Sequence, residues 1–189
     1  MTTQAEHLVS YQTSRPLSRR LAMIAGVLFT GGVSIGWLTY VHRSASALRH
    51  VPGTSAWWQH AVVAAVALAI VGVTWLGQRR GRVGPRVWLA PLSSSAAHRS
   101  SRLFIQALWS AAGFARAVAA TLLMLLLAFC AFRAGYQITS GLDPNSTVNA
   151  WGGPTYVGAM ACHYLDLFVL MAAVAWLLDR LLPGRDGRP

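Results

Sequence analysis

One apolar stretch near the C-terminus carries the side chains best suited to chemistry, namely Cys162, His163 and Asp166. A carboxylate inside a membrane costs about 2.5–3.5 kcal/mol on insertion scales, so Asp166 should face other helices and hold a partner. His163 and Asp166 stand at i and i+3 and would share one face of a helix. The spacing predicts an intramembrane polar site. It is either a pair that carries a proton or coordinates a ligand, or a polar clasp that fixes helix packing.

Haem ligation is an alternative chemistry, carried by His60 and His163. These histidines lie on different apolar runs, and their expected depths below the outer surface differ by only about 5 Å. Two histidines at similar depth suit the axial positions of a haem in a helical bundle. Apart from this possible haem, no cofactor and no bound metal ion are expected. Cys130 and Cys162 are expected to be free thiols, because two cysteines in apolar runs form neither a disulfide framework nor a zinc signature.

The segment 134–156 is long, nearly uncharged and rich in turn-forming residues. It leads directly into the last apolar run. We expect an ordered loop folded over the helix ends, with a ligand lid as the alternative. The residues assigned to binding in this outer loop are Asn149, Trp151, Gly152, Gly153 and Pro154.

The segment 77–102 is basic, and the sequence contains no phosphate-binding loop, zinc-protease motif or serine-hydrolase motif, so no enzymatic activity is expected. Its arginines are expected to contact anionic lipid head groups, with an acidic partner protein as the alternative. Nucleic-acid binding is not expected despite a formal net charge of +11, because the arginines are dispersed over several loops. The head-group contacts are assigned to Arg79, Arg80, Arg82 and Arg86.

Four apolar runs must position these residues. The chain is 54% hydrophobic and only 11% charged, which is too little charge to coat a soluble domain of 189 residues. A spanning helix needs about 20 apolar residues. Spans are expected at 21–41, 57–76, 117–132 and 157–178, with an interfacial lead-in helix at 103–115. The fold class is therefore an all-α membrane protein, a four-transmembrane-helix bundle within 21–182, flanked by tails at 1–20 and 183–189.

The arginines also predict the orientation. Most of them fall in the two tails and the middle loop, and few fall in the other two loops. Because basic loops stay on the cytoplasmic side, both termini are expected to be cytoplasmic. The first run exceeds the about 7–15 apolar residues of a signal peptide, so an uncleaved first span is expected. The expected location is the cytoplasmic (inner) membrane of a bacterium.

Small residues predict how the spans pack, because lipid gives no hydrophobic drive between helices. The first run contains a GxxxG step at Gly32 and Gly36, and the second carries Ala61, Ala65 and Ala69 at helical spacing. These two runs are therefore expected to form a tight helical hairpin. Homodimerisation through the glycines is the alternative.

Small size and the lack of catalytic motifs favour a non-enzymatic accessory or assembly subunit. It would bind partners through the outer loop 134–156 and the basic inner loop 77–102. The expected partners are the lipid bilayer and another membrane protein or a second copy of the chain. The alternatives are the redox carrier with haem on His60 and His163, and a proton-coupled small-solute transporter centred on Asp166.

Overall fold

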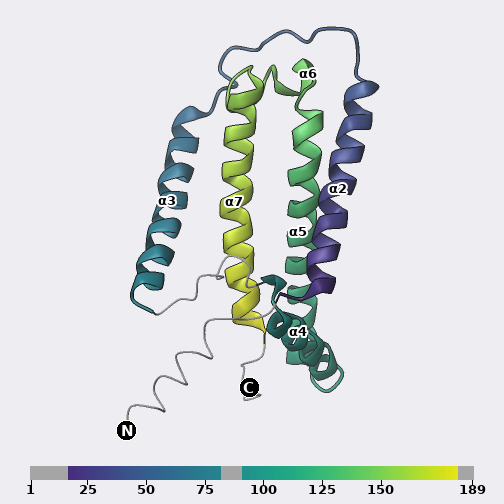
Figure 1. The fold of residues 1–189 in the computed structure, drawn as a ribbon, viewed down its shortest axis with the longest axis vertical. Helices are drawn as coiled ribbons and strands as arrows, with labels where there is room; N and C mark the ends of the chain where they lie inside the picture. Colours follow the sequence, from purple (N-terminus) through teal and green to yellow (C-terminus); the bar gives the residue numbers. More distant parts are fainter. Residues whose placement is uncertain (1–16, 82–90, 183–189) are drawn as a thin grey trace. The chain divides into compact units, whose positions relative to one another are not determined.

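The computed structural model describes residues 17–81 and 91–182 of the chain. Its architecture is all-helical, and those two ranges contain no strand beyond an isolated backbone bridge between Leu17 and Ser93. In chain order, with the labels of Figure 1, the helices are α2 (Arg19–Val41), α3 (Trp57–Arg79), α4 (Ser94–Ala107), α5 (Ala111–Ser140), α6 (Pro144–Thr147) and α7 (Tyr156–Leu181). The prediction of an all-α fold is confirmed.

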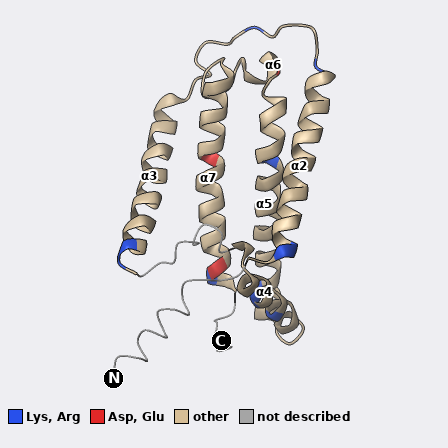
Figure 2. Cartoon of the chain, viewed as in Figure 1, with Lys and Arg blue, Asp and Glu red and all other residues tan. Residues whose placement is uncertain are grey.

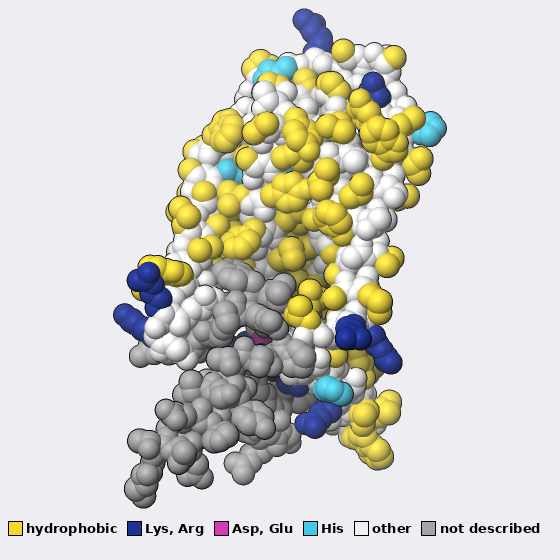
Figure 3. Space-filling view, in the orientation of Figure 1, with side chains coloured by type: hydrophobic (Ala, Val, Ile, Leu, Met, Phe, Trp, Pro, Cys, Tyr) yellow, Lys and Arg dark blue, Asp and Glu magenta, His cyan; other side chains and the backbone are white. Residues whose placement is uncertain are grey.

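Four helices are long and apolar enough to cross a membrane. Helices α2 and α3 have 23 residues each, α5 has 30 and α7 has 26, with mean hydropathies of 1.8, 2.0, 2.2 and 1.8. Even 23 residues reach about 35 Å, which exceeds the hydrocarbon core of a bilayer. On the face drawn in Figure 3, hydrophobic side chains cover the helices, and the dark blue side chains lie toward the helix ends. The four predicted spans are confirmed by length and composition, whereas the orientation of the termini stays a prediction.

The third span has different bounds from those predicted. We expected a lead-in helix at 103–115 and a span at 117–132, but α4 ends at Ala107 and α5 runs unbroken from Ala111 to Ser140. The chain breaks at Ser110, whose hydroxyl oxygen accepts a hydrogen bond from the Gly113 N–H at 3.0 Å and so caps α5. Arg116 and Arg133, which flank the predicted span 117–132, both lie inside α5. The interfacial position of α4 stays a prediction.

The described helices belong to two compact units, each treated by itself below. Of the described residues, the loop-side unit comprises 23–69 and 125–173, and the tail-side unit comprises 17–22, 70–81, 91–124 and 174–182. Within the loop-side unit the helices lie in the order α3, α7, α5, α2 (Figure 1). Hydrogen bonds join each neighbouring pair in that order. This order places α7 and α5 in the middle and α3 and α2 at the edges.

The glycines of α2 pack against α5. A Cβ atom at Gly32 would overlap the carbonyl oxygen of Phe132, and one at Gly36 would overlap that of Tyr136. Gly135 of α5 faces the carbonyl oxygen of Phe29 in the same way. The predicted hairpin between the first two spans is therefore wrong, because the GxxxG step of α2 contacts α5, and α3 lies at the opposite edge of this unit.

In the tail-side unit, the residue before α4 pairs with Leu17, and α4 itself contacts the end of α7. The Ser93 hydroxyl caps α4 by accepting a hydrogen bond from the Ala96 N–H at 3.2 Å. Leu103 is buried on the same helix. Arg99 forms an ion pair with Asp179 of α7, so a charged contact joins α4 to the end of the last span.

Candidate functional site

Asp166 is paired with a histidine from a different helix. Its Oδ2 atom lies 3.2 Å from Nε2 of His60 on α3. His163, the partner predicted from spacing, forms no hydrogen bond with Asp166 in the described structure. Figure 2 marks one acidic position part-way along α7 and one basic position part-way along α5, level with each other in the view. The polar site therefore draws on three helices rather than on α7 alone.

The outer loop fixes the position of His60. The Ala56 N–H donates to the carbonyl oxygen of Trp151 at 2.8 Å, which ties the start of α3 to that loop. The Ala56 carbonyl then accepts from Nδ1 of His60 at 2.8 Å. The rings of His60 and Trp151 lie 5.8 Å apart, centroid to centroid. These contacts bury the His60 side chain to 7% exposure and aim its other nitrogen at Asp166.

His163 is held by Arg133 of α5. The Nη2 and Nε atoms of Arg133 lie 2.8 and 3.2 Å from Nε2 of His163. The guanidinium also stands 5.5 Å from the Tyr136 ring centroid, within range of a cation–π contact. One residue along α7 from His163, the Tyr164 hydroxyl donates to the carbonyl oxygen of Ala134 at 2.7 Å. Arg133 therefore turns toward α7 instead of marking the end of a span.

The hydrogen bonds decide where protons must lie. A carbonyl oxygen only accepts, so Nδ1 of His60 carries a proton toward Ala56. The contact between Nε2 of His60 and the Asp166 carboxyl then needs a second proton, carried by one atom or the other. Arginine only donates, so Nε2 of His163 accepts and that imidazole is neutral. The four side chains together thus hold one shared proton and one uncompensated guanidinium.

The cysteines take no part in this network. Cys162 and Cys130 are both free thiols and both are buried. Cys162 was predicted to belong to the polar site, and it lies next to His163 in the sequence. No hydrogen bond of Cys162 occurs among the described residues. It is therefore a neighbour of the site on α7 and makes no polar contact with its members.

The same contacts do not fit axial haem ligation by His60 and His163. Both nitrogens of the His60 ring already hold partners, the Ala56 carbonyl and the Asp166 carboxyl. Nε2 of His163 accepts from Arg133. A haem iron bound at Nε2 of both rings would have to replace the contacts with Asp166 and Arg133, whereas the Nδ1 bond of His60 could remain. Within residues 17–81 and 91–182, no group of three or more His, Cys, Asp or Glu side chains is placed to hold a metal ion.

Asparagine side chains of the outer loop join it to the loop between α2 and α3. Asn149 accepts from the Val51 N–H at 2.8 Å. Asn145 accepts from the Leu48 N–H at 2.8 Å and donates to the Ser46 carbonyl at 2.8 Å. Asn149 was predicted to bind a ligand or partner, and its amide is instead used within the chain. The first seven residues of the predicted loop 134–156 belong to α5, so the segment between the helices is shorter than expected and contains α6. Whether this segment acts as a ligand lid stays a prediction.

The remaining outer-loop residues shape the entry into α7. Gly152 lies against the carbonyl oxygen of Gly158, where no side chain fits, and Gly153 has a φ of 85°. Pro154 follows, and the Thr155 hydroxyl accepts from the Gly158 N–H at 3.2 Å as a helix cap. Of the five residues assigned to binding, Asn149, Trp151 and Pro154 are exposed, and Trp151 has the largest side chain of the three. It is also the one that touches His60.

At the other end of α3, Arg79 lies over the Trp75 ring at 3.8 Å from its centroid. Arg180 lies over Trp176 at the end of α7 in a similar way. Such arginine–tryptophan pairs are typical of a membrane–water interface. Arg80 is exposed beside Arg79, and their contact with lipid head groups stays a prediction. The other two assigned residues, Arg82 and Arg86, lie outside the described residues.

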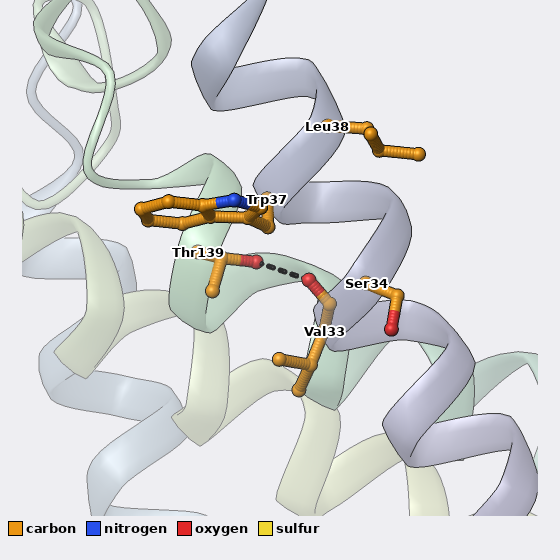
Figure 4. A pocket seen from close by; sticks show the side chains of 5 residues that line it. All are labelled: Val33, Ser34, Trp37, Leu38 and Thr139. Carbon is orange, nitrogen blue, oxygen red and sulfur yellow. Dashed lines mark hydrogen bonds between the residues drawn. The ribbon is translucent and has the colours of Figure 1, made fainter.

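An open pocket of about 450 Å³ lies between α2 and α5 (Figure 4). Val33, Ser34, Trp37, Leu38 and Thr139 line it. The Thr139 hydroxyl donates to the Val33 carbonyl at 2.8 Å, and the Ser34 hydroxyl donates to its own helix, so both are already bonded. The pocket contains no ionisable side chain. Apolar contact is what it can offer, and the chemistry lies in the cluster of α3, α5 and α7.

Comparisons with protein-family models, with curated proteins and with solved structures gave no match. Function must therefore be inferred from the geometry of the site. The feature with chemical content is the set His60, Arg133, His163 and Asp166, called the polar cluster below. Sequence reasoning placed His163 and Asp166 in the polar site and named His60 only as a possible haem ligand. It did not assign Arg133 to the site. Arg133 directly follows the predicted span 117–132, and nothing in the sequence signals that the helix continues beyond it to Ser140.

Proposed function

We propose that this chain is a small multi-pass membrane protein that binds and releases a proton at the His60–Asp166 pair, as a proton-coupled small-solute transporter would. The observation that carries the proposal is the 3.2 Å contact between the two side chains, which needs one shared proton. A proton held between an imidazole and a carboxyl can leave without either group moving far. Ionisable side chains within spanning helices commonly mark proton pathways.

The unequal exposure of the pair supports this role. The His60 side chain is 7% exposed and that of Asp166 is 36% exposed. The imidazole is thus fixed by the loop, and the carboxyl has an open side from which a proton or a solute can approach. A clasp that served packing alone would have no need of an open carboxyl. Arg133 adds a positive charge to the same cluster.

Infrared difference spectroscopy on the purified protein in lipid nanodiscs tests the proposal. Between acidic and alkaline samples, the wild type should show a change in a protonated-carboxyl or imidazolium band that Asp166→Asn abolishes. Asp179→Asn is the matched control, because Asp179 lies on the same helix and pairs with Arg99 outside the cluster. Identical spectra for the wild type and Asp166→Asn would contradict a proton site at this pair.

The assembly-subunit role is a second candidate, and the small buried share of the spans favours it. Only 11% of the apolar window of α2 and of α3 is buried inside the chain, with 17% for α5 and 22% for α7. Most of each span therefore faces lipid or another protein. A photoreactive residue at exposed Leu68 on α3 should give a discrete protein adduct in native membranes if the chain is a subunit. Lipid adducts alone, at Leu68 and at exposed Leu122 on α5, would contradict this second candidate.

A further inference from the structure

Among the residues that the structure describes, the guanidinium of Arg133 forms hydrogen bonds along one edge. Its Nε and Nη2 atoms, which form the side edge, both donate to Nε2 of His163. An arginine has five N–H groups, and the three others, on Nη1 and Nη2, donate to no acceptor in the described part of the chain. These three include the pair at the tip of the fork. That tip can bind two oxygens of one group side by side.

The charge of Arg133 is also unmatched. His163 must be neutral, because its Nε2 accepts from the guanidinium. With a proton shared between them, His60 and Asp166 are neutral as a pair, whichever of the two atoms carries that proton. Within residues 17–81 and 91–182, Arg133 forms no ion pair with a carboxylate. A positive charge inside a spanning helix is expensive without a counter-ion.

We propose that the tip of Arg133 binds an oxyanion, a carboxylate or a phosphate, beside the His60–Asp166 pair. His163 serves as the positioning residue, because its Nε2 holds the side edge and directs the tip away from itself. The Tyr136 ring supports one face of the guanidinium. The inference rests on the proposed function and deepens it, since it names an oxyanion as the solute coupled to the proton. The anion neutralises the cluster while the proton is bound.

Calorimetric titration of the whole protein in phosphatidylcholine nanodiscs tests this site, with acetate and inorganic phosphate as the probes. We expect saturable binding that Arg133→Gln weakens by about tenfold or more, the loss expected for a charge-assisted hydrogen-bonded pair. Arg133→Lys should also weaken it, because lysine keeps the charge and loses the fork. Arg116→Gln is the matched control, since Arg116 lies on the same helix and is exposed. It should bind as the wild type does.

His163 has its own pair of variants. His163→Gln keeps an oxygen that accepts from Arg133 and should keep most of the affinity, whereas His163→Leu should lose it. This rescue by an acceptor separates positioning from packing, because both variants alter the shape of the site. Equal loss in the two variants would overturn the positioning role of His163.

The lipid composition of the nanodisc distinguishes a dissolved oxyanion from a lipid phosphate. Binding of acetate or phosphate in phosphatidylcholine indicates a solute. Saturation only with added phosphatidylglycerol, lost in Arg133→Gln, indicates a lipid phosphate, which is the same chemistry. No saturable response to either probe or to phosphatidylglycerol would overturn the site. The infrared experiment on the His60–Asp166 pair contains no acetate, and the calorimetric titration tests Arg133. Failure of the proton site and failure of the anion site are therefore separate results.

Discussion

At the scale of single residues, the side chains of His60 and Asp166 are hydrogen-bond partners although 106 positions separate them in the sequence. Removing either one leaves a polar group in the spans without its partner. We expect His60→Leu and Asp166→Leu each to lower the free energy of unfolding by about 1–3 kcal/mol. The double variant should lose less than the sum of the two, because it leaves no orphaned group. Unfolding in mixed detergent micelles measures the free energy of unfolding of both single variants and the double variant. Strictly additive losses would contradict a direct interaction between the two side chains.

The residues of the polar cluster were predictable in type but not in pairing. Spacing placed His163 and Asp166 on one face of α7, which they do share. It does not report which neighbouring helix each side chain meets, and that decides the partners. Arg133 directly follows the predicted span 117–132, and a charge after an apolar run usually marks the end of a span. In the structure, α5 continues to Ser140, and the guanidinium donates to His163 of α7.

At the scale of elements, the contact between α2 and α5 depends on the absence of side chains. Gly32 lies against the Phe132 carbonyl, whereas Gly31 has nothing near the position of a Cβ atom. We expect Gly32→Ala to destabilise the fold by about 1–3 kcal/mol, because the two backbones must move apart. Gly31→Ala is the matched control and should be neutral or slightly stabilising, since alanine favours helix. Thermal unfolding in one detergent compares the two, and equal midpoints would contradict this packing.

The contact between the α2–α3 loop and the loop that precedes α7 can also be tested, with a series of variants at Asn145. Asn145→Asp keeps the oxygen that accepts from the Leu48 N–H but loses the donor to Ser46. Asn145→Ala loses both bonds. Hydrogen exchange of the Leu48 amide should therefore rise in Asn145→Ala and stay near the wild-type rate in Asn145→Asp. The same rate in all three proteins would show that the side chain does not hold this loop.

The sequence predicts the existence of the spans well and their packing poorly, for a physical reason. Hydropathy reports how long a helix can remain in lipid, which is why 21–41 and 57–76 match α2 and α3 at their first turns and through most of their lengths. Small residues report that a helix can be approached closely, without naming the neighbour. The GxxxG step at Gly32 was therefore assigned to α3 and meets α5 instead.

At the scale of the whole molecule, the arginine distribution predicts that both termini are cytoplasmic. Cys130 and Cys162 are buried, so the wild type gives a low background for thiol labelling. An impermeant maleimide added to intact cells should label Ser55→Cys, in the loop between α2 and α3. It should label Ser101→Cys, on α4, only after the membrane is opened. The reverse pattern would contradict the predicted orientation.

The order α3, α7, α5, α2 in the loop-side unit also bears on how the chain is assembled during synthesis. Helices α2 and α3 are made first, yet the Val33–Thr139 and His60–Asp166 bonds each join residues 106 positions apart. Each of these two helices therefore cannot form its hydrogen bond until its partner helix has also been synthesised and inserted. Helices α5 and α7 can pair as soon as both are made. The pair α5 and α7 thus forms the surface to which α2 and α3 bind. Two separately expressed halves, one with α2 and α3 and one with α5 and α7, should therefore be able to associate in one membrane.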